Sequence, residues 1–435
     1  MERIPVSEKT RKRLNALLRG EAGESEDIRS AFLRLATQLL IEEGLEEEVE
    51  DLLGRDYYQR GPLTGRGYRN GYRTGRLKSA EGEIRYGVPQ VSDRDEPFRS
   101  RIRAVLSGRT EELENLAVQM YARGLSTRDI EGAFSSPDGT LLLSRTAVSR
   151  ITERIWESYE AFATRDLSET EILYLFVDGI AERLHPSCPR EAVLCAWGYT
   201  WDGTKVLVHL APGTKEDTAS CRAFFEDLKR RGLPDPLLVT TDGAPGLIRA
   251  VEECFPRSSR QRCLVHRMRN LQSKVPDPLW PEFKERVRAV YQAPSASTAH
   301  VLAEELVRLY QADLPSAVAC FQDDFDACIA HLAFPVTHRK TIRTTNFLER
   351  LFLEERRRTK VIPHAFGEKP LLKLMYASIL LASETWRNLS VSEFETRQLA
   401  SIRLKQNERF EQNHAPVIVQ KPSRRPVRFS SKKRT

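Results

Sequence analysis

The chain has 435 residues, of which 40% are hydrophobic and 30% are charged, and its formal net charge is +7. This length allows two to four domains, and no run approaches the roughly 20 consecutive apolar residues that a membrane-spanning helix needs. We therefore expect a cytoplasmic protein without a membrane partner, because the N-terminus also lacks the apolar core of a signal peptide. Seven scattered cysteines predict reduced thiols and not a disulfide framework.

Positive charge is concentrated in two segments. Residues 421–435 carry seven Lys or Arg and no acid, and residues 55–78 carry seven more against the single acid Asp56. Clustered cations gain affinity for phosphates by displacing counterions, so these segments indicate a polyanionic partner. For residues 421–435 the alternative is a solubilising tail.

The first predicted elements are one or two amphipathic helices over residues 28–52, where apolar residues recur at helical spacing. In the next segment tyrosines alternate with arginines on a glycine-rich backbone. We interpret it either as an irregular segment that contacts phosphates and stacks on bases, or as a turn-rich hairpin whose tyrosines pack locally. In the first interpretation the DNA-binding residues are Arg66, Arg69, Arg73 and Arg76.

Three predicted helices follow, over residues 111–123, 127–134 and 144–158, with a break at 124–126. Their order resembles a helix-turn-helix unit, although helical triplets of this size also occur in proteins that bind no DNA. In a helix-turn-helix the start of the last helix faces DNA. The residues there are Arg145, Thr146, Ser149 and Arg150.

Beyond residue 170 the pattern becomes that of strands. Apolar segments at 172–177, 192–200 and 205–210 predict a meander. A helix (218–231), a strand that ends at Asp242, a helix (246–255) and a short strand near 262–265 follow, which is the element order of an RNase H-like α/β domain. Residues 267–340 are helical and strand-poor, so we predict an insertion there.

Two of these strands end in an Asp-Gly pair, Asp178-Gly179 and Asp242-Gly243. An ionised Asp at the end of a buried strand is costly unless it binds a cation, and Mg²⁺ prefers a few carboxylate oxygens. Two or three acids that converge at strand ends therefore suit metal-dependent phosphoryl transfer. Asp-Gly is also a common turn pair, and we interpret Asp202-Gly203 as a turn without a catalytic role.

The third candidate acid is Glu349, which lies in an Arg-rich helical stretch. Helical spacing places it on one face with Phe352 and Arg356. Its alternatives are a capping-box role with Asn346, or replacement as the metal-binding acid by one of its competitors, Glu354 and Glu355. The basic residues of this stretch are DNA-binding candidates: Arg356, Arg357, Arg358 and Lys360.

Cys263 and His266 form a lone Cys-x-x-His pair. A zinc site needs about four ligands, and no second pair stands at suitable spacing, so we favour a structural or supporting role near Asp242 over zinc. The sequence contains no Walker-type glycine loop and no nucleophile elbow.

Taken in order, these motifs resemble those of Mutator-type bacterial insertion-sequence transposases over about residues 25–385. The matching segments are Asp178-Gly179, residues 241–247, residues 261–266, residues 345–349 and, upstream, residues 68–71 and 124–130 with 148–150. The resemblance implies a DDE transposase with the triad Asp178, Asp242 and Glu349. It further implies two Mg²⁺ or Mn²⁺ ions, double-stranded DNA partners (the terminal inverted repeats of its own element and target DNA) and a homodimer or larger assembly. The chain departs from the family at Phe352, where Asn is common, and after Lys360.

We therefore predict an α/β RNase H-like catalytic core with an all-helical insertion, preceded by a helical, helix-turn-helix-like DNA-binding region. The predicted domains are a helical N-terminal region (1–53), an Arg/Gly-rich short-strand segment (54–108), the DNA-binding domain (109–168), the first part of the core (169–266), the insertion (267–340), C-terminal core helices (341–390) and a basic tail (391–435). Two other functions stay open: a transposase-derived DNA-binding protein that no longer cuts, and an RNase H-like nuclease without strand transfer.

Overall fold

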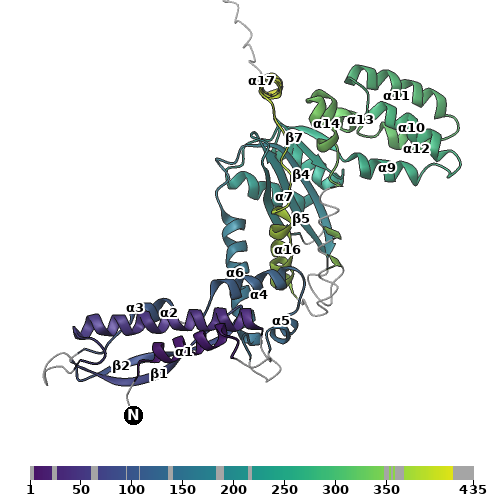
Figure 1. Ribbon diagram of the computed structural model, residues 1–435. Coiled ribbons are helices and arrows are strands. Elements are labelled where there is room, and N and C mark those ends of the chain that lie inside the picture. The colour runs from purple at the N-terminus through teal and green to yellow at the C-terminus, as the bar shows by residue number, and fades with distance from the viewer. Residues whose placement is uncertain are drawn as a thin grey trace, which may run out of the picture. The chain divides into compact units, whose positions relative to one another are not determined.

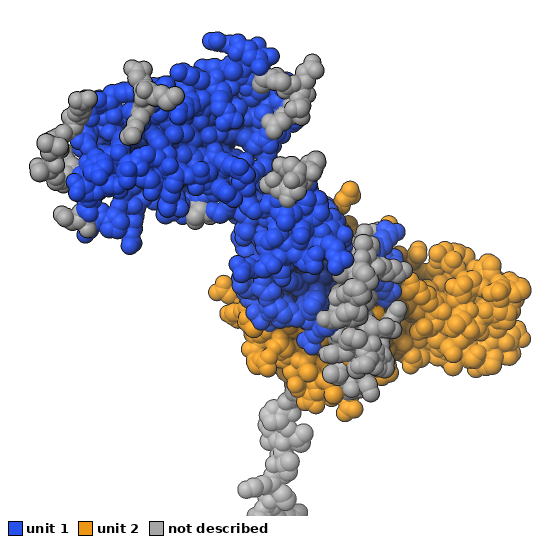
Figure 2. Space-filling view, turned by 90° about the horizontal axis from the view of Figure 1, so that it is seen from below, with its two compact units in different colours: residues 1–163, 184–189, 351–385 blue, residues 164–183, 190–350, 386–435 orange. Residues whose placement is uncertain are grey.

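A computed structural model describes residues 4–21, 27–59, 67–94, 96–106, 108–135, 141–182, 191–213, 218–346, 352–353, 356–357 and 367–414. The chain divides into two compact units, coloured separately in Figure 2. Unit 1 comprises residues 1–163, 184–189 and 351–385, and unit 2 comprises residues 164–183, 190–350 and 386–435. Among the described helices, none has the length and apolarity that a membrane crossing requires.

Unit 1 begins with two helices, α1 (Val6–Leu18) and α2 (Ile28–Leu53), beside a hairpin of β1 (Tyr68–Ser79) and β2 (Gly82–Ser92) (Figure 1). Residues 28–53 thus form one continuous helix. Its apolar face packs on the hairpin, and the buried residues of this contact are Ile41, Leu45, Leu77, Ile84, Tyr86 and Val88.

The hairpin settles one choice that the sequence left open. The interpretation of residues 68–76 as an irregular segment is wrong, because they pair with β2 throughout most of β1. Tyr72 packs locally, since its hydroxyl donates a hydrogen bond to Glu46 Oε1 at 2.8 Å. Gly75 is required for this packing, because a Cβ at that position would lie 2.4 Å from the Tyr86 ring.

The next helices of unit 1 are α3 (Arg101–Val105), α4 (Glu111–Ala122), α5 (Thr127–Ala133) and α6 (Arg145–Thr164), and the two-residue strand β3 (Gly108–Arg109) pairs with β1. The bounds of α4 and α5 agree with the predicted helices, and α6 extends six residues further. Ser126 and Asp129 form a reciprocal capping box that starts α5. The helix α16 (Glu368–Ser383) is buried over residues 371–379, and the Tyr376 ring contacts Tyr159 and Phe162 of α6.

Unit 2 is built on a five-stranded sheet of β4 (Ile172–Glu182), β5 (Glu191–Thr200), β6 (Lys205–Pro212), β7 (Leu238–Thr241) and β8 (Ser259–Arg262). Their order in the sheet is β6-β5-β4-β7-β8. The strand β5 is antiparallel to both of its neighbours β4 and β6, as the predicted meander requires, and β7 and β8 run parallel to β4. The helices α7 (Thr218–Arg230) and α8 (Pro245–Cys254) cover one face of this sheet, with Phe225 and Leu247 packed against Leu175 and Val177.

The last strand differs from the prediction. The sequence placed it near residues 262–265, whereas β8 covers Ser259–Arg262 and Cys263 is already the N-cap of a helix. The apolar pair Leu264-Val265 belongs to that helix. A strand of sequence Ser-Arg-Gln-Arg escapes an apolar pattern search, and it tolerates burial because its polar side chains find partners in the helices that follow.

Those helices form what we call the helical subdomain, residues 264–342. It contains α9 (Leu264–Gln272), α10 (Trp280–Tyr291), α11 (Ala296–Tyr310), α12 (Pro315–Gln322), α13 (Phe325–Ile329), the 3-10 helix η1 (Ala330–Ala333) and α14 (Val336–Ile342). The subdomain has a core of its own, with Phe283, Val287, Leu306 and Phe321 at its centre. The region is helical and free of strands over its described residues, as predicted.

Part of the expected basic tail is folded. Residues 393–414 form the helix α17 (Glu393–His414), and Gln406 Nε2 donates hydrogen bonds to Leu237 O and Ser259 Oγ at 2.8 and 2.9 Å. The most basic part, 421–435, lies outside the described residues. Six cysteines fall within the described residues, and all six are free thiols.

Candidate active site

The sheet of unit 2 brings two of the three predicted acids together. The parallel strands β4 and β7 are in register at Val177↔Thr241, so Asp178 and Asp242 are the next pair along. Neighbouring strands lie about 4.8 Å apart. Leu175 and Val177 face the α7–α8 core, and because side chains alternate along a strand, both acids project from the opposite face.

Asp178 is buried, with 5% of its surface exposed. Burial raises the pKa of Asp178 to about 7, and the neighbouring Asp242 adds to the rise. His266 and the hydrogen bonds from Thr345 and Gly179 act in the opposite direction without cancelling it. A nearby cation would favour the ionised form of the Asp178 carboxylate.

Asp242 is held by its own turn. Its Oδ1 accepts the Ala244 N–H at 2.9 Å, and Pro245 then begins α8. Gly243 adopts φ +90°, which other residues rarely reach, and an added Cβ would lie 2.3 Å from Arg262 Nε. The turn therefore depends on glycine for two independent reasons.

Cys263 and His266 lie at this same edge of the sheet. The Cys263 N–H donates to Thr241 O at 2.7 Å, directly before Asp242. Thr345 donates to Cys263 Sγ from its N–H at 3.3 Å and from its Oγ1 at 3.4 Å. Burial tends to raise the pKa of the Cys263 thiol, but the hydrogen bonds from His266 and Thr345 outweigh it and lower that pKa. Cys263 thus links the end of β7, the start of the helix after β8 and the segment at Thr345, all of which lie beside the acids.

The segment that leads to the third acid is fixed here too. Thr240 Oγ1 donates to Ile342 O at 2.8 Å, and the Leu264 N–H donates to Arg343 O at 3.0 Å. Thr345 is fully buried against Cys263. Glu349 itself, its competitors Glu354 and Glu355 and the neighbouring Arg358 and Lys360 lie outside the described residues.

The two described carboxylates suit a hard cation. Carboxylate oxygens are ligands that Mg²⁺ and Mn²⁺ prefer, and a raised pKa at a buried acid is relieved when a cation binds. Over the described ranges, no three His, Cys, Asp or Glu side chains group closely enough to hold a metal ion. Cys263 Sγ instead accepts hydrogen bonds from Thr345, which matches a supporting role better than a zinc ligand.

The predicted DNA-binding residues lie in different surroundings. The four at the start of α6 are all exposed, whereas Val148 and Ile151 of the same helix are buried. On the hairpin, Arg73 and Arg76 are exposed. Arg69 is half-buried and donates hydrogen bonds to the backbone oxygens of Arg55 and Asp56, which ties it into the fold. Arg356 is half-buried, Arg357 is exposed, and Arg66 lies outside the described residues.

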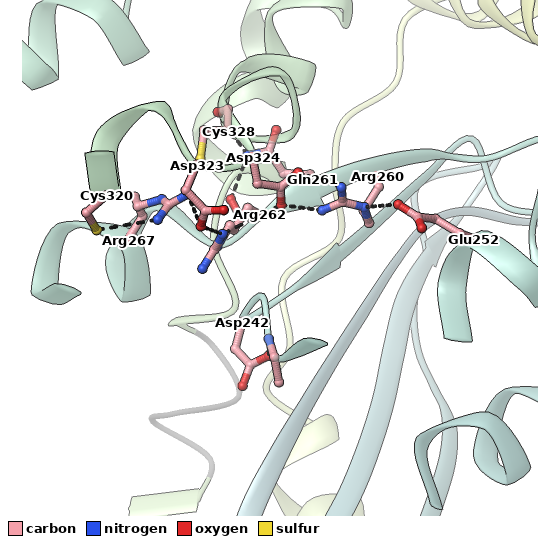
Figure 3. A network of polar contacts seen from close by, with 11 residues as sticks. Asp242, Glu252, Arg260, Gln261, Arg262, Arg267, Cys320, Asp323, Asp324 and Cys328 are labelled. Carbon is pink, nitrogen blue, oxygen red and sulfur yellow. Dashed lines mark hydrogen bonds and ion pairs between the residues drawn. The ribbon is translucent and has the colours of Figure 1, made fainter. Parts of the chain in front are cut away.

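Sequence reasoning missed two residues beside the acids, Thr345 and Arg262. Thr345 stands directly before Asn346 in a segment that the sequence had singled out, so its neighbourhood was a usable signal. Arg262 packs over Gly243. It also pairs with Asp323, 61 positions further along the chain (Figure 3). No local pattern reveals a partner at that separation.

Comparison with known proteins gives consistent matches. The family described as "Transposase, Mutator family" matches residues 9–388. The transposase for insertion sequence element IS6120 of Mycolicibacterium smegmatis is 32% identical over 62% of this chain and 83% of that protein. The transposase for IS406 of Burkholderia multivorans is 30% identical over 81% of this chain and 90% of its own length. The transposase for ISRM5 of Rhizobium meliloti is 28% identical over 81% and 88%.

Proposed function

This chain belongs to the Mutator family of transposases, and we propose that it cuts and joins DNA with a metal site formed by Asp178, Asp242 and Glu349. The observation that carries the proposal is the side-by-side position of Asp178 and Asp242 at the ends of two parallel strands. Bound Mg²⁺ or Mn²⁺, two ions in this proposal, would activate the attacking water or 3′-hydroxyl and stabilise the leaving oxygen.

The assignment of Glu349 draws on the path of the chain. Thr345 contacts Cys263 beside the two acids, and Glu349 follows four positions later. Four residues span at most about 14 Å, so a carboxylate at that position is within reach of Asp178 and Asp242. The third acid would therefore complete an oxygen-rich site without any change at the sheet.

The chain's own groups have positioning roles in this scheme. Asp178 and Asp242 hold the metal, and the hydrogen bonds of Gly179 and Ala244 fix one oxygen of each carboxylate. Cys263 with Thr345 joins the strand end to the segment of the third acid. In-line displacement at phosphorus needs such positioning and charge stabilisation, and no protein nucleophile.

We further propose that unit 2 is an RNase H-like core and that α4, α5 and α6 form a helix-turn-helix. Support for the core comes from its element order, three antiparallel strands followed by helix, strand, helix and strand. Support for DNA binding comes from the exposed residues Arg145, Thr146, Ser149 and Arg150 at the start of α6. Arg73 and Arg76 of the hairpin would add phosphate contacts. A homodimer or larger assembly on DNA, in the cytoplasm, completes the proposal.

The test is a cleavage and joining assay in trans on DNA that carries the element's own ends. Wild-type protein with Mn²⁺ should nick the ends and join them to target DNA, while Asp178→Ala and Asp242→Ala should bind the ends and do neither. Cleavage without joined products would identify a nuclease. Wild-type binding without cleavage would identify a DNA-binding protein that has lost catalysis. Cleavage by Asp178→Ala at the wild-type rate would refute the site assignment.

A further inference from the structure

Arg262 packs against the turn that carries Asp242. Its side chain lies directly over Gly243, where an added Cβ would meet the Arg262 Nε, Cζ and Cδ atoms at 2.3, 2.9 and 3.0 Å. Arg262 is 8% exposed, so water cannot take its place easily. The flat guanidinium therefore packs directly against the Asp242-Gly243 turn.

The helical subdomain holds this guanidinium in place. Arg262 Nη1 lies 2.9 Å from Asp323 Oδ2 and 3.7 Å from Asp324 Oδ2 (Figure 3). Asp323 also pairs with the buried Arg267 of α9 at 3.2 Å. Asp323 ends α12 and Asp324 precedes α13, so both carboxylates that hold the Arg262 guanidinium belong to the helical subdomain.

The same strand contains a natural control. Arg260 makes the stronger ion pairs: its guanidinium grips both oxygens of Asp324, each at 2.5 Å, and it also contacts Glu252 at 3.2 Å. However, the three atoms nearest to a Cβ placed on Gly243 all belong to Arg262, and none of them belongs to Arg260. Arg260 and Arg262 thus share the strand β8 and the partner Asp324, but differ in their contact with the turn.

We propose that Arg262 is a positioning residue for the metal-binding carboxylate of Asp242. Clamped by Asp323 and Asp324, it transmits the placement of the helical subdomain to the Asp242-Gly243-Ala244 turn. The subdomain is then part of the apparatus that shapes the active site, beyond any contact it makes with DNA. The link to metal binding rests on the function proposed above, whereas the clamp itself can be tested without it.

The first test is hydrogen exchange on the full chain without metal or DNA. The Ala244 amide donates to Asp242 Oδ1 at 2.9 Å, so its exchange reports on the turn directly. In Arg262→Gln we expect exchange in a peptide covering residues 241–247 to rise roughly tenfold, because local opening becomes easier. Arg260→Gln should leave that peptide unchanged even though it loses more ion pairs.

Two results of this experiment would overturn the clamp. One is wild-type exchange in Arg262→Gln, and the other is an equal rise in both variants, which would mean that any loss of charge from β8 loosens the edge. If Arg262→Gln does not fold, Asp323→Asn takes over the test, since the Asp323 side chain is 63% exposed and its loss should leave folding intact. Asp323→Glu, which keeps the ion pair, should then restore the wild-type rate.

The second test is Mn²⁺ binding by calorimetry on the same proteins in the absence of DNA. Loss of a residue that orients a metal ligand typically weakens binding about tenfold or more, and we expect this for Arg262→Gln but not for Arg260→Gln. Equal Mn²⁺ affinity in wild type and Arg262→Gln would refute the positioning role at the metal. A wild-type protein that binds no Mn²⁺ and cuts no DNA would refute the proposed function instead, and the exchange comparison would still decide on the clamp.

Discussion

Replacing Asp178 by Asn should stabilise the metal-free protein while it abolishes catalysis. Burial raises the pKa of Asp178 to about 7, from an ordinary value of 3.8. An ionised carboxylate at that position therefore costs the fold up to about 4 kcal/mol, since each pH unit of difference corresponds to 1.36 kcal/mol. Asn keeps the shape and removes the charge, so the substitution should recover much of this energy.

The pH dependence gives the sign of the effect. The folded protein keeps the proton of Asp178 up to about pH 7, whereas the unfolded chain loses it near pH 3.8. Because the folded state binds more protons in between, the contribution of Asp178 to stability is complete below pH 3.8 and falls until pH 7. The advantage of Asp178→Asn over wild type should accordingly be larger at pH 8 than at pH 5.

Calorimetric melting in EDTA at both pH values measures this difference, at one scan rate because a chain of this size can unfold irreversibly. Mn²⁺ should then raise the melting temperature of wild type and not that of Asp178→Asn, because only the charged site binds the ion. If Asp178→Asn melted at or below the wild-type temperature in EDTA at pH 8, this would refute the conclusion that the ionised Asp178 carboxylate destabilises the metal-free protein. Equal stabilisation of both proteins by Mn²⁺ would refute it as well.

Three further predictions concern other parts of the chain. Thr345→Val should slow DNA cleavage about tenfold, the equivalent of one hydrogen bond to Cys263, without a change in DNA affinity; an unchanged rate would mean that this contact is irrelevant to the site. Arg150→Ala should weaken binding of end DNA and lower the slope of log K against log salt by about one, whereas Arg154→Ala, whose guanidinium pairs with Glu114, should not; similar slopes for both would argue against the α6 surface. Burial holds the pKa of His209 well below its usual range, so its contribution to stability should be lost as the pH falls below about 6.5. The melting temperature of His209→Gln between pH 7 and 5 should decline less than that of wild type, and parallel declines would contradict this.

The positions of Asp178 and Asp242 at the ends of neighbouring strands could be predicted because each follows a local signal. An apolar run followed by Asp-Gly marks the end of a buried strand, and Asp178 and Asp242 follow strands that are paired in register. The helices α4 and α5 were equally readable, since Ser126 caps α5 in a pattern that needs only four residues. Such features are set by neighbours in the chain, which is why one sequence suffices to find them.

The bounds of the strand β8 and the presence of the helix α17 could not be predicted, because both elements make contacts with residues that are distant in the sequence. The strand β8 has no apolar alternation, and its charged side chains Arg260 and Arg262 find their partners Asp324 and Asp323 more than 60 positions away. The helix α17 was read as part of a basic tail, because its charged sequence hides the contact of Gln406 with the start of β7. Long-range polar contacts of this kind leave no periodic signal.

The path of the chain between Asp242 and Glu349 explains how a large helical subdomain can be inserted between two residues of one active site. The chain enters the subdomain at Cys263 and leaves it near Thr345, and these two residues are hydrogen-bonded to each other. The Leu264 N–H and Arg343 O close the same junction at 3.0 Å. Cys263 and Thr345 are 82 positions apart in the sequence, yet they are in contact at the edge of the sheet. The subdomain therefore forms a closed loop that leaves and rejoins the core at the same place. The side chains of β8 add further links between the subdomain and the sheet, because Arg260 pairs with Asp324, Gln261 Nε2 donates to Cys328 O, and Arg262 pairs with Asp323. In the proposed clamp, Arg262 is the member of this set whose atoms lie nearest to Gly243, so it is the link that connects the subdomain to the Asp242 turn.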